Sequence, residues 1–93
     1  MKGTIYLMGK PTLSSLESGI RIPCSSDFEK NSQTSRFFFE GGHKVNGFTC
    51  NRRFWFVSEQ KDVILECLVD TVDDGHNALF AKIVEEQSKL SRE

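Results

Sequence analysis

Aromatic residues are concentrated in the middle of this 93-residue chain, and their spacing is the strongest constraint on its fold. Seven of the ten aromatic side chains lie between Phe37 and Phe56. Side chains alternate between the two faces of a β-strand, so Phe54 and Phe56 are predicted to share one face while Trp55 lies on the other. We expect the Phe54 and Phe56 face to pack into the core of a β-sheet.

Segments 36–40 and 48–57 are predicted to pair as a β-hairpin. An Asn-Gly pair lies in the connection between them, and this dipeptide is typical of a hairpin turn. In the first strand of the pair, alternation places Phe37 and Phe39 on the core face and Arg36 on the opposite face. The aromatic cluster is therefore predicted to lie on a β-hairpin.

The rest of the chain supplies three more candidate strands and one long loop. Residues 4–8 and 19–22 alternate in polarity and are predicted to form short strands, and the mostly apolar segment 63–69 is predicted to be a central strand. The polar residues 23–35 are predicted to be a loop that Phe28 anchors.

The C-terminal segment changes to helical spacing. Apolar residues recur three or four positions apart, at Leu79, Phe80, Ile83, Val84 and Leu90. A helix is predicted to begin near Asp73 or Asp74, because either carboxylate can cap the free amides of a first turn. The predicted fold is α+β, a single domain of residues 1–93 in which an antiparallel β-sheet of about five strands packs against one C-terminal helix. A small, partly closed barrel is the alternative.

Composition indicates a soluble protein of the cytoplasm. Charged residues make up 27% of the chain, and the mean hydropathy is −0.37. The longest apolar run near the start, residues 5–8, is too short for a signal peptide or a membrane span. We therefore expect a cytoplasmic protein without a membrane partner.

No catalytic or metal-binding pattern is evident. The cysteines Cys24, Cys50 and Cys67 form no C-x-x-C pair, which argues against a zinc site and a disulfide framework. The acidic segment 70–76 lacks the ligand spacing of an EF-hand. A catalytic Cys-His pair would require His43 to approach Cys50 across a turn. We expect no enzyme activity, no cofactor and no bound metal.

Two fragments resemble turns in the last barrel domain of translation elongation factors such as elongation factor Tu. They are residues 19–23 and 40–47, which together cover less than a fifth of the chain. No fold, function or site residue is carried over from this resemblance.

The charge distribution suggests a binding function. Residues 1–61 contain nine Lys/Arg and five Asp/Glu, whereas residues 62–93 contain three and eight. The expected function is stoichiometric binding of another protein, as a cytoplasmic inhibitor, an immunity-type protein or a phage or mobile-element accessory factor. A sheet that binds RNA or single-stranded DNA is the alternative, and a nucleic-acid partner is less expected because the chain is slightly acidic.

Two groups of residues are candidates for the contact surface. The favoured group is an acidic helix face that would bind a basic partner, and the second is a basic aromatic face of the hairpin. The acidic residues are Asp73, Asp74, Glu85 and Glu86, and the hairpin residues are Arg36, Arg53 and Trp55. Trp55 has two alternatives, because it belongs to the core if the C-terminal helix covers it and to a contact surface if it is exposed.

Overall fold

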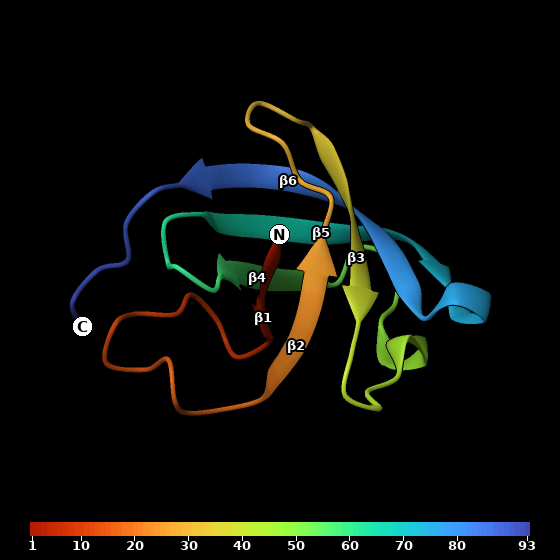
Figure 1. The fold of residues 1–93 in the computed structure, drawn as a ribbon, viewed down its shortest axis with the longest axis horizontal. Helices are drawn as coiled ribbons and strands as arrows, with labels where there is room; N and C mark the ends of the chain where they lie inside the picture. The colour runs from red at the N-terminus through yellow and green to blue at the C-terminus, as the bar shows by residue number, and fades with distance from the viewer.

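Six antiparallel strands close into a barrel in the computed structural model, which describes residues 1–93 (Figure 1). The strands are β1 (Lys2–Tyr6), β2 (Arg21–Ser26), β3 (Thr34–Phe39), β4 (Arg53–Ser58), β5 (Ile64–Asp73) and β6 (Ala78–Gln87). Around the barrel they follow the order β1-β2-β3-β6-β5-β4, and β4 pairs with β1 to complete the circle. Two short 3-10 turns, η1 (Val45–Gly47) and η2 (Asp74–His76), complete the secondary structure. None of the helical turns has the length and apolar character that crossing a membrane requires.

The predicted C-terminal helix is wrong, and with it the α+β fold class, because Ala78–Gln87 is strand β6 in an all-β protein. The apolar residues of this segment fit both the period of a helix and the period of two of a strand. Leu79 and Ala81 are fully buried and Ile83 packs against the same core, so every second side chain faces the barrel interior. Pairing with β3 on one side and β5 on the other overrides the helical preference of the Ala, Leu and Glu residues.

The predicted hairpin of 36–40 with 48–57 is also wrong, although the faces assigned to its residues are confirmed. Strand β3 pairs with β2 and β6, and β4 pairs with β1 and β5. The connection between β3 and β4 is long enough to cross one end of the barrel, where Val45 and Phe48 are buried. The Asn-Gly pair therefore forms part of η1 rather than a tight hairpin turn.

The barrel interior is filled by aromatic rings from strands far apart in the sequence. The ring centre of Phe37 lies 5.2 Å from that of Phe54 and 5.3 Å from that of Phe56, and all three side chains are fully buried. Edge-to-face contacts of this kind stabilise beyond the burial of apolar area alone. At one end of the barrel, Phe48 lies 5.0 Å from Phe39 and extends the cluster.

The two short strands predicted near the N-terminus, 4–8 and 19–22, are present with shifted bounds, since β1 ends at Tyr6 and β2 begins at Arg21. The polar loop is shorter than expected. Ser26 lies at the end of β2 and Ser35 near the start of β3, and both side chains are buried. Their hydroxyls are 2.7 Å apart and form a hydrogen bond, so these polar residues can enter strands without losing a partner. The connection covers only 27–33, and Phe28 anchors it in the core as expected.

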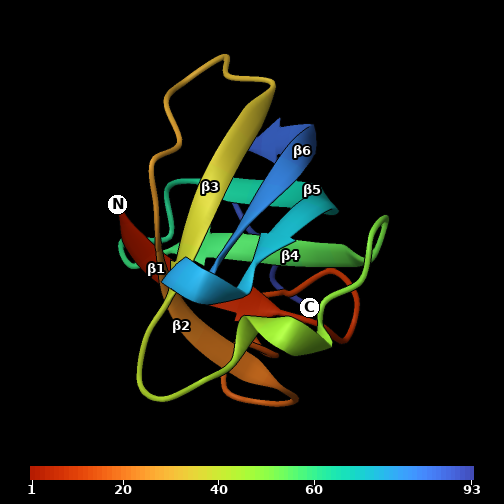
Figure 2. The ribbon, with the colours of Figure 1, turned by 90° about the vertical axis from the view of Figure 1, so that its right-hand side faces the viewer.

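The two 3-10 turns lie at the same end of the barrel (Figure 1, Figure 2). Asn77, which follows η2, connects them. Its Oδ1 accepts a hydrogen bond from the Val45 amide at 3.1 Å, and its Nδ2 donates to the His43 carbonyl oxygen at 2.8 Å. Its φ of 48° lies in the left-handed region, which asparagine tolerates better than most residues. The Asn77 side chain thus adds two hydrogen bonds to the contacts that hold the long connection over the core.

Replacing Asn77 by alanine should lower the free energy of unfolding by about 2 kcal/mol, because two hydrogen bonds are lost and the left-handed backbone becomes strained. Urea denaturation measures this change. Asn77→Gly is the matched control, since glycine accepts the backbone conformation and loses only the side-chain bonds. It should lose about half as much. Equal losses in both variants would show that the backbone conformation contributes nothing.

Candidate binding surface

The four acidic residues predicted to share a helix face lie at opposite ends of the β5–β6 hairpin. Asp73 and Asp74 are at the turn, whereas Glu85 and Glu86 are near the end of β6. Seven residues of extended chain separate Ala78, which lies opposite Asp73, from Glu85, a span of about 23 Å. The structure therefore brings the four carboxylates together only as two separate pairs.

Asp73 already has a partner within its own turn. Its Oδ2 is 2.9 Å from Nδ1 of His76, and hydrogen bonding from His76 lowers the pKa of the Asp73 carboxyl. The aspartate consequently stays ionised to lower pH than an isolated one. Both side chains are exposed to solvent to a large degree, so this ion pair is of the weak surface kind.

Trp55 lies on the outside of the barrel but is only 7% exposed. It belongs to a small second cluster whose other members are Tyr6, Val57, Ile64 and Leu90. The C-terminal tail and the β1–β2 connection meet over this cluster, where the Leu13 amide donates a hydrogen bond to the Ser91 carbonyl oxygen at 2.9 Å. Of the two alternatives for Trp55, burial is the observed one, although a tail and a loop provide the cover in place of a helix.

Arg53 is held by a neighbouring carboxylate. Its Nε lies 3.1 Å from Oε2 of Glu66 on the adjacent strand β5. The Glu66 side chain is only 16% exposed, so the arginine compensates the partial burial of the carboxylate. This pairing leaves Arg53 less available to an external anion.

Arg36 differs from Arg53 because no carboxylate of the chain pairs with it. Its guanidinium carbon lies 4.3 Å from the ring centre of Phe80 and 5.6 Å from that of Phe38. The Nε atom is buried and has no hydrogen-bond partner. The two Nη nitrogens are not buried in this way. Stacking on two rings restricts the side chain and leaves its terminal nitrogens able to bind an anion.

The backbone at Arg36 is fixed as well. Asp27, in the β2–β3 connection, accepts a hydrogen bond from the Arg36 amide at 2.7 Å and another from the Ser35 hydroxyl at 2.9 Å. The Asp27 amide in turn donates to the Arg36 carbonyl oxygen at 3.2 Å. Strand pairing and the Asp27 carboxylate fix the backbone at Arg36, and stacking on the two rings positions its guanidinium.

The outer surface around this arginine forms a continuous basic and aromatic patch, which we call the Arg36 face. Arg36 lies opposite Phe80, and Lys82 lies between Thr34 of β3 and Leu68 of β5. Lys82 is exposed and forms no ion pair. The members of the face are Thr34, Arg36, Phe38, Leu68, Phe80 and Lys82. Arg36 is a residue predicted from the sequence, whereas Phe80 and Lys82 fall in the segment predicted to be a helix. The alternation of Leu79, Ala81 and Ile83 is the signal that indicates a strand there.

Two of the three cysteines are not placed for nucleophilic chemistry, whereas Cys50 is exposed. Cys24 and Cys67 are buried inside the barrel. Burial raises the pKa of the Cys24 thiol to about 12, and burial also raises the pKa of Cys67. Both thiols are therefore protonated at neutral pH, and the thiolate is the reactive form. The structure contains no group of three His, Cys, Asp or Glu side chains that could hold a metal ion.

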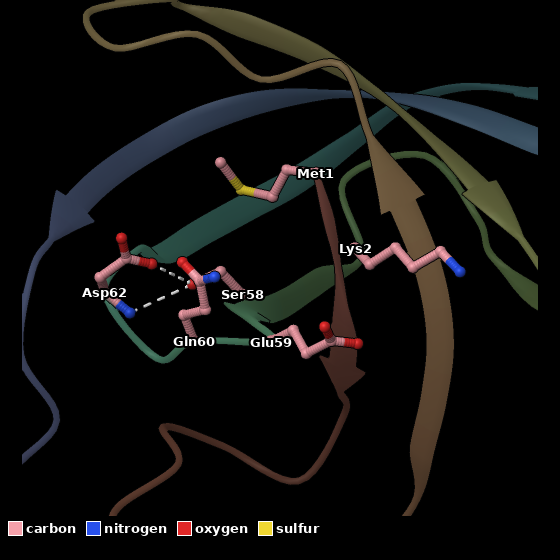
Figure 3. A pocket seen from close by; sticks show the side chains of 6 residues that line it. All are labelled: Met1, Lys2, Ser58, Glu59, Gln60 and Asp62. Atoms are coloured by element: carbon pink, nitrogen blue, oxygen red, sulfur yellow. Dashed lines mark hydrogen bonds between the residues drawn. The ribbon is translucent and has the colours of Figure 1, made fainter.

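A hollow of about 300 Å³ lies beside the β4–β5 turn (Figure 3). Its lining residues are Met1, Lys2, Ser58, Glu59, Gln60 and Asp62. The Ser58 hydroxyl donates to Oδ1 of Asp62 at 2.8 Å and accepts the Asp62 amide at 3.2 Å. These bonds define the turn and occupy the side chains of Ser58 and Asp62.

No protein-family model, no curated protein and no solved structure matches this chain.

Proposed function

We propose that this chain is a stoichiometric protein-binding domain whose Arg36 face receives a carboxylate of a partner protein. The observation that carries the proposal is the guanidinium of Arg36, which is braced between Phe80 and Phe38 without an internal ion pair. A guanidinium presents paired donors that match a carboxylate, and arginine and aromatic residues dominate the binding energy of protein interfaces. Because the arginine is already positioned, less side-chain entropy is lost when it binds.

The surrounding charges favour a protein over a nucleic acid. Arg36 and Lys82 are the two unpaired cations of the face. Along the same outer surface, Glu66 lies opposite Glu85, and Asp73 lies opposite Ala78 next to Phe38. A phosphate backbone is held by about six or more clustered cations, and carboxylates at both ends of the patch would repel it. A single acidic side chain needs only the central arginine.

The more specific roles are proposals within this function. A cytoplasmic inhibitor, an immunity-type protein or a phage or mobile-element accessory factor would each act by occupying one partner in a one-to-one complex. The Arg36 face suits such a role, since it is a rigid surface on paired strands and needs little rearrangement to bind.

Capture of partners from a native lysate, with analysis of both protein and nucleic acid, tests the proposal. Reversing the charge in Arg36→Glu should reduce recovery of a specific protein about 30-fold, which corresponds to the loss of about 2 kcal/mol at an interface hot spot. Arg21→Glu is the matched control, since it makes the same charge change on the neighbouring strand β2, where Arg21 already pairs with Glu17. It should retain the partner.

Two results would contradict the proposal. Equal capture by Arg36→Glu and the parent protein, with both folded in urea titration, would exclude the Arg36 face as the binding surface. Recovery of RNA or single-stranded DNA in place of a protein, lost in Arg36→Glu, would assign the face to nucleic acid.

A further inference from the structure

The last part of β6 has a neighbouring strand on one side only. Pairing with β3 ends where Thr34 lies opposite Lys82, and the last hydrogen bond toward that side runs from the Ile83 amide to the Gln33 carbonyl oxygen at 2.8 Å. Pairing with β5 shifts register at Val84, which has no partner residue, and then continues from Glu85 to the end of β6. Residues 84–87 therefore form a free strand edge in an otherwise closed barrel, and Figure 1 shows this end of β6 extending past the β2–β3 connection.

The backbone of Glu86 directs its hydrogen-bonding groups to the open side. Just before β5, the Val63 carbonyl oxygen accepts a hydrogen bond from the Ser58 amide of β4, and within β5 the Val69 amide donates to the Arg52 carbonyl oxygen. The backbone N–H and C=O groups of odd-numbered residues therefore face β4 in this part of the chain, and those of even-numbered residues such as Glu66 face β6. Glu85, which lies opposite Glu66, bonds β5, so the next residue, Glu86, turns its N–H and C=O away.

A groove runs beside this free edge. It has a volume of about 490 Å³ and lies between the β2–β3 connection and the end of β6. Its apolar lining comes from Met1, Phe28 and Val63, and its charged lining from Glu86, Asp62 and Lys30. Val84, at the start of the edge, is 53% exposed. The edge therefore combines free backbone groups with an apolar surface of the size that one side chain can enter.

We propose that an extended, basic segment of a partner protein adds to this edge as a further strand. Strand addition satisfies free backbone groups and reads alternate side chains in adjoining pockets. The carboxylates of Glu85, Glu86 and Asp62 outnumber the cations, which are Lys30 and the terminal amine of Met1, so basic side chains complement the edge. A second copy of this chain would instead bring like charges together, which disfavours pairing of two such edges. This surface is distinct from the Arg36 face and selects a partner of opposite charge.

The edge itself is tested by a pair of proline substitutions. Glu86→Pro should leave the urea midpoint close to that of the parent, because proline is tolerated where a strand N–H has no partner. Glu85→Pro should lower the midpoint strongly, because it removes a hydrogen bond to β5. Similar midpoints in the two variants, or a lower midpoint for Glu86→Pro than for Glu85→Pro, would overturn the assignment of the free edge.

Binding is tested by NMR titration of ¹⁵N-labelled protein with a blocked octapeptide of alternating valine and lysine. The peptide should shift the Glu86 amide signal in a saturable way, and Glu86→Lys, which keeps the fold, should weaken binding at least about tenfold. A peptide of alternating valine and glutamate is the matched probe and should bind at least about tenfold more weakly. Absence of a saturable shift up to about 1 mM peptide, or equal binding by Glu86→Lys, would overturn the proposal. Self-association that Glu86→Pro abolishes would assign the edge to a second copy and would also overturn it.

Discussion

Replacing Phe37 by alanine is expected to lower the free energy of unfolding by about 4 kcal/mol, the largest effect of any single change considered for this barrel. The ring is fully buried and contacts both Phe54 and Phe56, each about 5 Å away between ring centres. Because β3 and β4 are not neighbours in the sheet, these contacts join opposite walls of the barrel. Removing the ring leaves a cavity that paired strands cannot collapse to fill.

Phe38→Ala provides the matched control for this prediction. Phe38 is the next residue of β3, but its side chain lies half-buried on the outer surface. Its removal should lower the free energy of unfolding by about 1 kcal/mol. Both values come from urea denaturation monitored by Trp55 fluorescence, with the slopes compared to confirm two-state unfolding. A Phe37→Ala loss no larger than that of Phe38→Ala would mean that the ring cluster does not form the central core.

The faces of the aromatic strands could be predicted because they depend only on local alternation. Phe54 and Phe56 face inward, as do Phe37 and Phe39, and each pair is separated by one residue that faces outward. Side chains alternate between the faces of a strand, so Arg36 and Arg53 mark the outward face of each segment. The pairing of these strands could not be predicted in the same way, since it depends on closure between β1 and β4, whose residues are about fifty positions apart.

Segment 78–87 was misassigned because its residues satisfy both common periods. Leu79 and Ile83 are four positions apart, which suits a helix, and with Ala81 between them they also suit a strand. The decision between the two comes from β3, which lies more than forty positions earlier and supplies backbone partners for Ala78 to Lys82. Strand preference of this kind is set by the neighbouring strands more than by the residues themselves.

Only part of the candidate site could be predicted from the sequence, because the rest also depends on strand pairing. Arg36 was identified from its position on the outer face of an aromatic strand. Its stacking partner Phe80 comes from β6, so the arrangement that positions the guanidinium exists only once β6 is a strand beside β3. The prediction for the acidic residues fails for the same reason. A helix would have placed the four carboxylates on one face, whereas the extended β5–β6 hairpin separates them into two pairs.

Barrel closure also places an unusual demand on Gly3. This residue lies on β1 opposite Ser58 of β4, and the ring of Phe56 occupies the space beside its Cα. A Cβ at this position would lie 2.5 Å from Cζ of Phe56 and within van der Waals overlap of the Val57 carbonyl oxygen. The first obstacle is a side chain packed in the core, and the second is backbone that β1 and β4 hold in register.

Gly3→Ala is therefore expected to lower the free energy of unfolding by about 3 kcal/mol through overpacking, with loss of pairing between β1 and β4 as the structural consequence. Urea denaturation measures the loss, and hydrogen exchange of the β1 and β4 amides locates it. Gly47→Ala is the matched control: a Cβ there meets no atom within 4 Å, and the backbone is outside the left-handed region, so the change should stay within about 0.5 kcal/mol. Equal stability of the two variants would show that β1 can move away from β4 at little cost, and the barrel would then not be closed at this seam.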